Sequence, residues 1–182
     1  TNGLTVTGSN AITLNGVISG AAGANLTKTG SGKLTLGGIN TFSGFTTIDG
    51  GLLDLAAGAS LASGTVNVRS GGTLGGSGAL SGAVTVAGGG RLALNSGNTL
   101  STGSLTLSNG AVLDLALGAP TLTPMVNIQG NLSITSSTFN ITDAGNLANG
   151  NYRLFNYTGT LTGTNLVADS TPTDLSSVDV GR

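Results

Sequence analysis

A short triplet of the form apolar–polar–apolar recurs along the chain about every twenty residues. Leu4–Val6, Leu34–Leu36, Val66–Val68 and Leu105–Leu107 are clear examples. Strict alternation over a few residues predicts a half-buried β-strand, because successive strand side chains point to opposite faces. Helices are not expected, since 33 glycines interrupt the sequence and each interior glycine costs a helix about 1 kcal/mol relative to alanine.

The apolar positions form three columns, separated by corners rich in glycine or asparagine. Successive members of the first column are 22, 20, 20, 18, 21 and 21 residues apart. The columns expected from the sequence are Val6, Lys28, Ile48, Val68, Val86, Leu107 and Ile128; Leu14, Leu36, Leu55, Leu74, Leu94, Leu115 and Ile134; and Ile18, Phe42, Leu61, Leu80, Leu100, Leu122 and Phe139.

Three short strands in each period of 18–22 residues predict an all-β fold, a parallel β-helix (β-solenoid) of about seven coils. Stacking would pair every strand with its counterpart one coil away and would place ladders of leucine, valine and isoleucine inside. Seven coils spaced by about 4.8 Å would give a shaft about 34 Å long. An antiparallel sandwich is the alternative, because short strands separated by turns also describe that fold. Its strand spacing would not hold one three-column register seven times.

The residue types that are missing exclude several functions. The chain has no His, Cys or Glu, which excludes a Ser-His-Asp triad, a thiol nucleophile, an ordinary zinc site and a disulfide. Its net charge is −1 and its six basic residues are scattered, which argues against binding to nucleic acid or to an anionic membrane. We therefore expect no cofactor and no small-molecule substrate.

The sequence divides near residue 142. Residues 1–142 hold the repeats, and residues 143–182 are expected to form a C-terminal coil or cap followed by a polar tail. Four of the six aromatic residues lie from Phe139 onward, and their bulk would help to cover the last coil. The chain begins at Thr1 without a signal peptide, so we interpret it as a segment of a longer protein. No apolar run of about 18 residues, as a membrane-spanning helix would need, is present.

Residues 26–55 match a more specific pattern: Lys-x-Gly-x-Gly, then Asn-Thr-aromatic, Gly, Thr-Thr-Ile and Gly-x-Leu. This stretch resembles the passenger-associated transport repeat of bacterial autotransporters, the type V secreted proteins. Phe45 departs from the pattern, because the family often has a further glycine there, and the local turn is expected to differ. The matching residues are Lys28, Gly30, Gly32, Asn40, Thr41, Phe42, Gly44, Thr46, Thr47, Ile48, Gly51 and Leu53.

The resemblance implies a function as well as a fold. Passengers of this family form a right-handed parallel β-helix outside the outer membrane and are linked to a C-terminal translocator barrel, which is absent from this sequence. The repeat is associated with efficient export rather than with catalysis. The resemblance therefore implies a non-enzymatic passenger segment, at the cell surface or secreted, that aids export and extracellular folding and acts as a stalk.

Candidate catalytic and metal sites are weak. Asp54 and Asp114 occupy the same outward position three coils apart, a separation of about 14 Å, whereas paired glycosidase carboxylates lie about 5–9.5 Å apart. Asp49 and Asp54 flank a corner with no catalytic arginine evident beside them. The Gly-rich stretch 75–80 has leucine where a calcium-binding solenoid needs aspartate, and 30–33 lacks residues of a phosphate loop. A polysaccharide-processing activity is thus the least favoured reading.

Two further features have more than one interpretation. Lys28 stands in an apolar column, so its ammonium reaches solvent from the core edge, its strand is locally reversed, or its charge has a function. The outward middle positions of the first strand form a ladder of small polar groups, which is either an ordinary exposed strand face or an adhesion or self-association surface for host or bacterial molecules. Its expected members are Thr5, Thr27, Thr47, Asn67, Thr85, Thr106 and Asn127.

Overall fold

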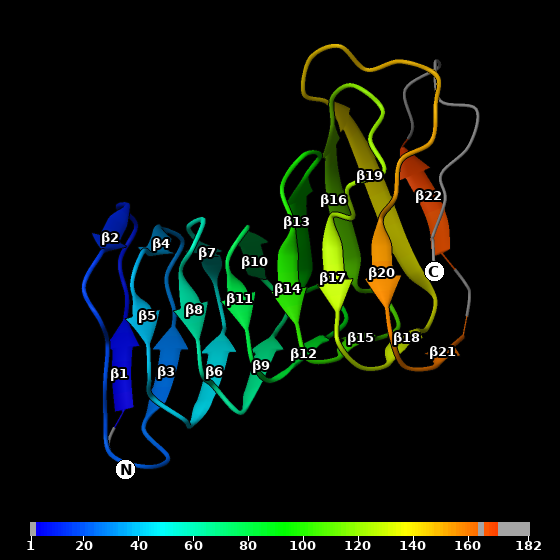
Figure 1. The fold of residues 1–182 in the computed structure, drawn as a ribbon. Helices are drawn as coiled ribbons and strands as arrows, with labels where there is room; N and C mark the ends of the chain where they lie inside the picture. Colours follow the sequence, from blue (N-terminus) through cyan, green and yellow to red (C-terminus); the bar gives the residue numbers. More distant parts are fainter. Residues whose placement is uncertain (1–2, 164–165, 171–182) are drawn as a thin grey trace.

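The computed structural model describes residues 3–163 and 166–170, and every regular element in these residues is a β-strand. The strands form three sheets that run side by side along an elongated stack of coils (Figure 1). Short apolar triplets dictate this arrangement, because three- to five-residue strands expose too little apolar surface to be stable alone and must stack on similar neighbours.

Two of the sheets have eight strands each and the third has six. Sheet A consists of β1 (Gly3–Val6), β3 (Asn25–Lys28), β6 (Phe45–Ile48), β9 (Thr65–Val68), β12 (Ala83–Val86), β15 (Leu105–Leu107), β18 (Leu132–Ile134) and β21 (Leu161–Thr162). Sheet B consists of β2 (Ile12–Leu14), β4 (Lys33–Leu36), β7 (Gly51–Leu55), β10 (Gly72–Gly76), β13 (Arg91–Asn95), β16 (Val112–Leu117), β19 (Ser137–Asp143) and β22 (Leu166–Ser170). Sheet C consists of β5 (Ile39–Asn40), β8 (Ser60–Leu61), β11 (Ala79–Leu80), β14 (Leu100–Thr102), β17 (Val126–Ile128) and β20 (Phe155–Tyr157).

All pairings between these strands are parallel, and each joins a strand to its counterpart in the next coil. This confirms the parallel β-solenoid and excludes the antiparallel sandwich. We number the coils by their strands in sheet A, so that coil 1 begins with β1 and coil 8 with β21. Coils 2 to 7 have a strand in all three sheets and coils 1 and 8 in two, which differs slightly from the seven coils expected.

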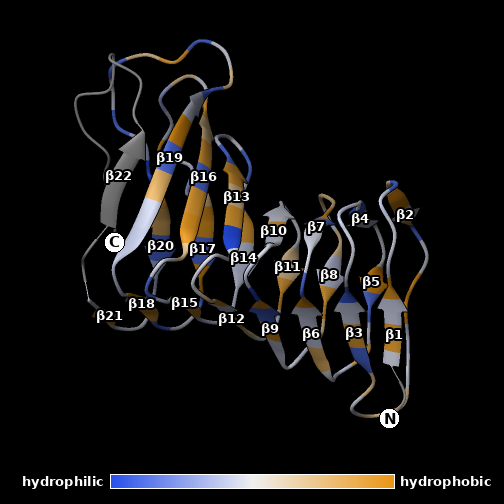
Figure 2. Ribbon diagram, turned by 180° about the vertical axis from the view of Figure 1, so that it is seen from behind, coloured by the Kyte–Doolittle hydropathy of each residue, from blue (hydrophilic) through white to orange (hydrophobic). Residues whose placement is uncertain are grey.

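The core is the narrow space between the three sheets. Leu26, Val66, Val84, Leu105 and Leu132 line it from sheet A, and all are almost completely buried. Buried and more exposed residues alternate along β3, β4, β6, β9 and β12, and Figure 2 shows the hydropathy of each residue along the strands. Burying one such side chain contributes about 1.5–3 kcal/mol, so each coil is stabilised mainly by the apolar residues that it stacks on its neighbours.

The first predicted column is correct up to Leu107 and wrong at its last member. Val6, Lys28, Ile48, Val68, Val86 and Leu107 are register partners in sheet A. The partner of Leu107 in the next coil is Ile134, whereas Ile128 belongs to β17 in sheet C. The error arises because coil 6 takes 27 residues, from Leu105 to Leu132, and a constant period of about 21 residues places the next strand too early.

The other two columns need corrections of the same kind. Leu74 pairs with Leu53 and Leu92, two residues away from the predicted position. Leu122 is 61% exposed in a loop outside the sheets, and Phe139 lies in sheet B. Ile134, predicted for the second column, lies in sheet A. Ile18 and Phe42, predicted for the third column, lie outside the strands.

The later coils are longer because two loops leave the shaft at the corner between sheets B and C. Residues 118–125 connect β16 to β17, and residues 144–154 connect β19 to β20; both protrude beyond the shorter N-terminal coils in Figure 1. Parallel pairing continues through β20, β21 and β22. The division at residue 142 stays a prediction, and most of the predicted polar tail, residues 171–182, lies outside the described residues.

Candidate functional site

Lys28 is a buried lysine whose ammonium is held by backbone carbonyl groups. Its Nζ donates hydrogen bonds to the carbonyl oxygens of Thr29 (2.8 Å), Gly30 (2.9 Å) and Gly50 (3.1 Å), and only 2% of the residue is exposed. Burial lowers the pKa of Lys28 because it disfavours the charged form. The expectations of a solvated ammonium and of a reversed strand are both wrong, since β3 pairs in parallel with β1 and β6.

The corner that receives this ammonium is unusually short. We count each corner by register, between the last paired residue of sheet A and the position that aligns with Leu52 in sheet B. This corner then consists of residues 49–51, whereas the corresponding corners of the coils on either side are residues 29–32 and 69–72. Gly51 has a φ of +63°, and a Cβ there would lie 2.8 Å from Nζ of Lys28. Glycine is required for both reasons: it accepts the left-handed conformation, and it leaves space for the lysine.

Asn40 joins three successive coils through one buried side chain. Its Oδ1 accepts a hydrogen bond from the N–H of Ile18 (3.0 Å) in coil 1, and its Nδ2 donates to the carbonyl oxygens of Gly38 (2.9 Å) in its own coil and Ser60 (3.0 Å) in coil 3. Thr41 follows with its side chain exposed, while its N–H donates to the carbonyl oxygen of Ile18 (3.0 Å). Asn40 therefore stabilises the stack on both of its sides.

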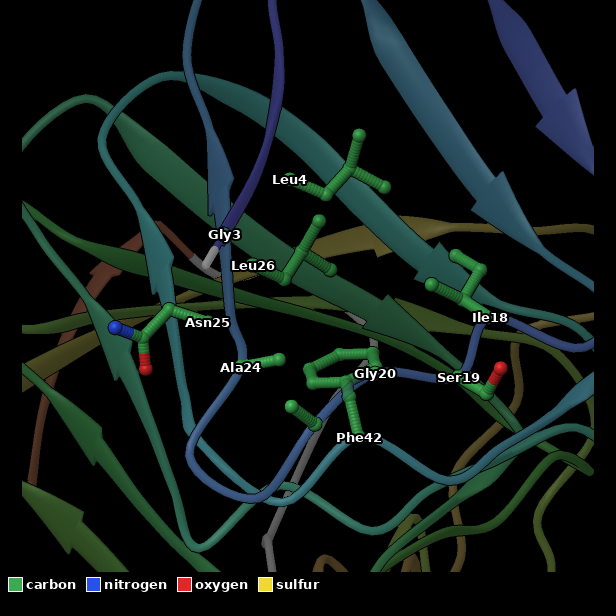
Figure 3. Close-up of a pocket in the computed structure, with 10 residues that line it drawn as sticks. Gly3, Leu4, Ile18, Ser19, Gly20, Ala24, Asn25, Leu26 and Phe42 are labelled. Atoms are coloured by element: carbon green, nitrogen blue, oxygen red, sulfur yellow. The ribbon is translucent and has the colours of Figure 1, made fainter. Parts of the chain in front are cut away.

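Phe42 forms part of an apolar hollow of about 320 Å³ in coils 1 and 2. Figure 3 shows its ring beside Leu26, Ile18 and Leu4, with Gly20 close to it. Phe42 is buried, whereas Leu4 is 40% exposed. Gly20 also lines the hollow, and a Cβ there would lie 2.6 Å from Cβ of Ala24.

The turn that leads into β6 requires close approach of two coils. The N–H of Gly44 donates to the carbonyl oxygen of Ala24 (3.0 Å), and a Cβ on Gly44 would lie 2.6 Å from the carbonyl carbon of Ala24. The buried hydroxyl of Ser63 lies 2.6 Å from the carbonyl oxygen of Gly44 and 3.1 Å from Oγ1 of Thr46. Buried Thr46 thus has a hydrogen-bond partner at the end of its own coil, as a buried hydroxyl requires.

Phe45, which departs from the family pattern, has an ordinary negative φ. Its N–H donates to Oδ1 of Asn25 (2.8 Å). Its side chain is 59% exposed. An exposed outward position at the start of β6 therefore admits a large side chain where the family often has glycine.

The repeat residues fall into three physical groups. Ile48 and Leu53 belong to the apolar core, and Thr41 and Thr47 lie on the outer surface. Gly32 is buried against the backbone of coil 1, at Ser9 and Asn10. Phe42 also belongs to the apolar core. The remaining members make close glycine contacts or buried polar contacts; these are Lys28, Gly30, Asn40, Gly44, Thr46 and Gly51.

The predicted outward ladder exists on sheet A, with one wrong member. Register pairs connect Thr5 through Thr106 as expected, and Ser133 continues the ladder in coil 7. Asn127 instead lies in β17 of sheet C, where its Oδ1 accepts a hydrogen bond from Nδ2 of Asn156 (2.7 Å). The cause is again the long coil 6. We call the set Thr5, Thr27, Thr47, Asn67, Thr85, Thr106 and Ser133 the sheet A ladder.

The candidate catalytic carboxylates are engaged in ion pairs between neighbouring coils. Asp54 and Asp114 lie on one ladder three coils apart, as predicted. Oδ2 of Asp54 lies 2.6 Å from Nζ of Lys33, and Oδ2 of Asp114 lies 2.6 Å from Nε of Arg91. Asp49, for which no neighbouring arginine was expected, lies 3.1 Å from Nη1 of Arg69; all these groups are partly exposed, so each pair contributes at most about 1 kcal/mol.

Sequence reasoning missed the buried polar residues outside the repeat pattern. Tyr152 is buried, and its hydroxyl donates a hydrogen bond to Gly118 (2.8 Å) or Ala148 (2.9 Å), whose carbonyl oxygens lie on the two long loops. Ser63 was missed because a serine among many serines gives no signal. A signal for Tyr152 was available, because it is an aromatic residue that follows an irregular, polar stretch. If such a tyrosine is buried, its hydroxyl usually finds a hydrogen-bond partner.

No group of three or more potential metal ligands of the His, Cys, Asp and Glu types occurs within the described residues. In the same part of the chain, no helix has the length and apolar character needed to cross a membrane.

Two comparisons with known proteins bear on this arrangement. Residues 26–55 match the family model described as Passenger-associated-transport-repeat. The chain is also 35% identical over 167 residues to the Adhesin BmaC autotransporter of Brucella suis biovar 1 (strain 1330). That match covers 82% of this chain and 5% of the adhesin. The repeat pattern, the parallel coils and both comparisons agree: the chain is a β-helical autotransporter passenger segment that carries a passenger-associated transport repeat.

Proposed function

We propose that the chain is a non-catalytic passenger segment located outside the bacterial outer membrane, at the cell surface or secreted. Its repeat at residues 26–55 aids export and extracellular folding, and its shaft holds more distal parts of the passenger away from the cell. Its partners are the rest of the passenger and a C-terminal translocator barrel. The ion pairing of Asp49, Asp54 and Asp114 across coils supports a structural rather than a catalytic use of these carboxylates.

The observation that carries this proposal is that strand pairing joins only adjacent coils. Within the described residues, the three ion pairs and the three-coil contact of Asn40 also join neighbours in the stack. A chain with this contact pattern can fold coil by coil as it emerges from a pore, since no early coil waits for a distant partner. The sequence has no cysteine, so no disulfide is formed before or after passage. Folding outside would then oppose backward sliding.

Removal of one whole coil from the repeat is expected to slow export. Deleting residues 26–45 joins Asn25 to Thr46 in register and removes Lys28 and Asn40. The experiment uses the full-length protein that contains this segment, and it follows surface appearance by protease accessibility in a pulse–chase. We expect the half-time to rise several-fold, because the buried polar contacts that join coils 1 to 3 are lost.

The matched control deletes residues 84–104, a whole coil outside the repeat, and joins Ala83 to Leu105 in register. We expect this variant to reach the surface at close to the normal rate. Equal rates for both deletions and the unaltered protein would overturn the export role, and equal slowing would mean that shaft length rather than the repeat matters.

A second candidate function is adhesion or self-association through the sheet A ladder. The outward positions of this ladder carry no charge, and the related protein is named an adhesin. Introducing lysines at Thr47 and Thr106 should abolish cell-to-cell aggregation that uses this face, because like charges would oppose contact. Lysine at Thr73, half-buried on sheet B, is the control. Unchanged aggregation in the ladder variant would exclude this role.

A further inference from the structure

The coils of this protein are similar enough that the correct stacking order must be selected. Apolar ladder positions hold leucine, valine or isoleucine in nearly every coil. These side chains would pack almost as well if coil 2 stacked directly on coil 4 with coil 3 looped out. Apolar burial is not directional, so it stabilises such a skipped register nearly as much as the native one.

Lys28 lies in coil 2, and its contact with the next coil distinguishes coil 3 from coil 4 as a stacking neighbour. It is the charged member of a ladder whose other members are Val6, Ile48, Val68, Val86, Leu107 and Ile134. Its ammonium donates to Gly50 in the three-residue corner 49–51 of coil 3 (3.1 Å). The four-residue corner 69–72 of coil 4 instead contains buried Gly72, packed closely on Ile48.

A second short corner supports the same relation between corner length and a buried donor. Counted by register, three residues, 135–137, also separate Ile134 from Thr138, whereas four residues separate their partners Leu107 and Val112; Ser137 is the first residue of β19. Within it, the buried hydroxyl of Ser137 lies 3.4 Å from the carbonyl oxygens of Ser108 and Thr135. In both places a buried side chain donates to one carbonyl of a short corner, Gly50 or Thr135, and to carbonyls of the longer corner in the preceding coil, as buried polar groups require.

We infer that Lys28 selects the stacking register of the transport repeat, because the short corner of coil 3 supplies the carbonyl of Gly50 as the third acceptor for its ammonium, beside those of Thr29 and Gly30 in its own coil. In the skipped register the ammonium would be buried without the carbonyl of Gly50, which is strongly unfavourable. The role of Lys28 is therefore specificity among competing stacks rather than net stability. This inference rests on the fold and not on the export role proposed above.

Introduced cysteine pairs can report the register, since the chain has no cysteine of its own. Thr27 and Thr47 are register partners, and Asn67 follows one coil later. Cysteines at positions 27 and 47 lie about 4.8 Å apart between Cα atoms in the native stack, within disulfide reach. Cysteines at positions 27 and 67 lie about 9.6 Å apart and can form a disulfide only when coil 3 is skipped.

The experiment refolds the 27/47 and the 27/67 cysteine-pair proteins separately from urea, oxidises each at once and measures the disulfide-bonded fraction by non-reducing mass spectrometry. The readout is the ratio of the 27–67 fraction to the 27–47 fraction. Adding Lys28→Met is expected to raise the 27–67 disulfide at least fivefold. Ile48→Met, one coil along the same ladder, is the control and should leave the ratio unchanged. An unchanged ratio in folded Lys28→Met would overturn the inference.

If circular dichroism finds Lys28→Met unfolded, Lys28→Gln decides by the same ratio, since glutamine keeps a donor but is uncharged and one atom shorter, so that it holds the carbonyl of Gly50 less well. An intermediate increase supports selection by hydrogen bonding to the corner, and no increase overturns it. The readout is refolding in solution. If Lys28→Met raises the disulfide ratio as expected while deletion of residues 26–45 leaves export unchanged, only the export proposal is rejected.

Discussion

Replacing Asn40 by leucine is expected to lower the free energy of unfolding by about 3–5 kcal/mol. Leucine has the same branching as asparagine but is larger, and the N–H of Ile18 and the carbonyls of Gly38 and Ser60 all lose their side-chain partner. The carbonyl of Gly38 keeps the hydrogen bond from the N–H of Ser60 (3.2 Å). Each buried group left without a hydrogen bond costs about 1–3 kcal/mol. Urea denaturation followed by circular dichroism measures this loss, and the effect should be among the largest of any single polar substitution.

Asn67→Leu is the matched control for this substitution. Asn67 lies on the outward sheet A ladder, half-buried, in coil 4. Changes at such surface positions usually stay within about 0.5 kcal/mol. A loss below 1 kcal/mol for Asn40→Leu, or equal losses for both variants, would mean that Asn40 does not hold three coils together.

Gly51→Ala is expected to cost about 3–4 kcal/mol. The left-handed φ of +63° alone costs a residue with a Cβ about 1–2 kcal/mol. The new methyl group would also lie 2.6 Å from the carbonyl oxygen of Gly30 and 2.8 Å from Nζ of Lys28. Forcing a group into a filled space typically costs a further 1–3 kcal/mol or so. The same urea titration measures the sum.

Gly58→Ala separates the two causes within the same coil. Gly58 has a φ of +78°, and no atom would lie within 4 Å of an added Cβ. Its substitution should therefore cost only the conformational part, about 1–2 kcal/mol. If both alanine variants lose the same stability, the close packing of the Lys28 corner makes no contribution, contrary to the structure.

The sequence predicted the solenoid well where the period was regular. Alternating triplets fix which residues face the core, because a strand has a side-chain period of two. The ladder from Val6 to Leu107 and the relation of Asp54 to Asp114 were therefore accessible from spacing alone. The family pattern added the repeat at residues 26–55, which the family model also matches.

The remaining errors have two physical causes. Loops can lengthen a coil without disturbing the stack, so a constant period placed Asn127 on the wrong sheet and missed Ser133. Hydrogen bonding across coils has no local sequence signature, so the carbonyl contacts of Lys28 and the three-coil contact of Asn40 needed the structure. The contact of Lys28 with Gly50 depends on corner length, which only the pairing of neighbouring coils reveals.

Distances between spin labels along the sheet A ladder test the stacking of coils most directly. Labels at Thr27 paired with Thr85, Thr106 or Ser133 span three, four and five coils. Double electron–electron resonance should give backbone separations of about 14, 19 and 24 Å, increasing by about 4.8 Å for each added coil. Separations that fail to increase in even steps, or that shorten between Thr106 and Ser133, would contradict a parallel stack.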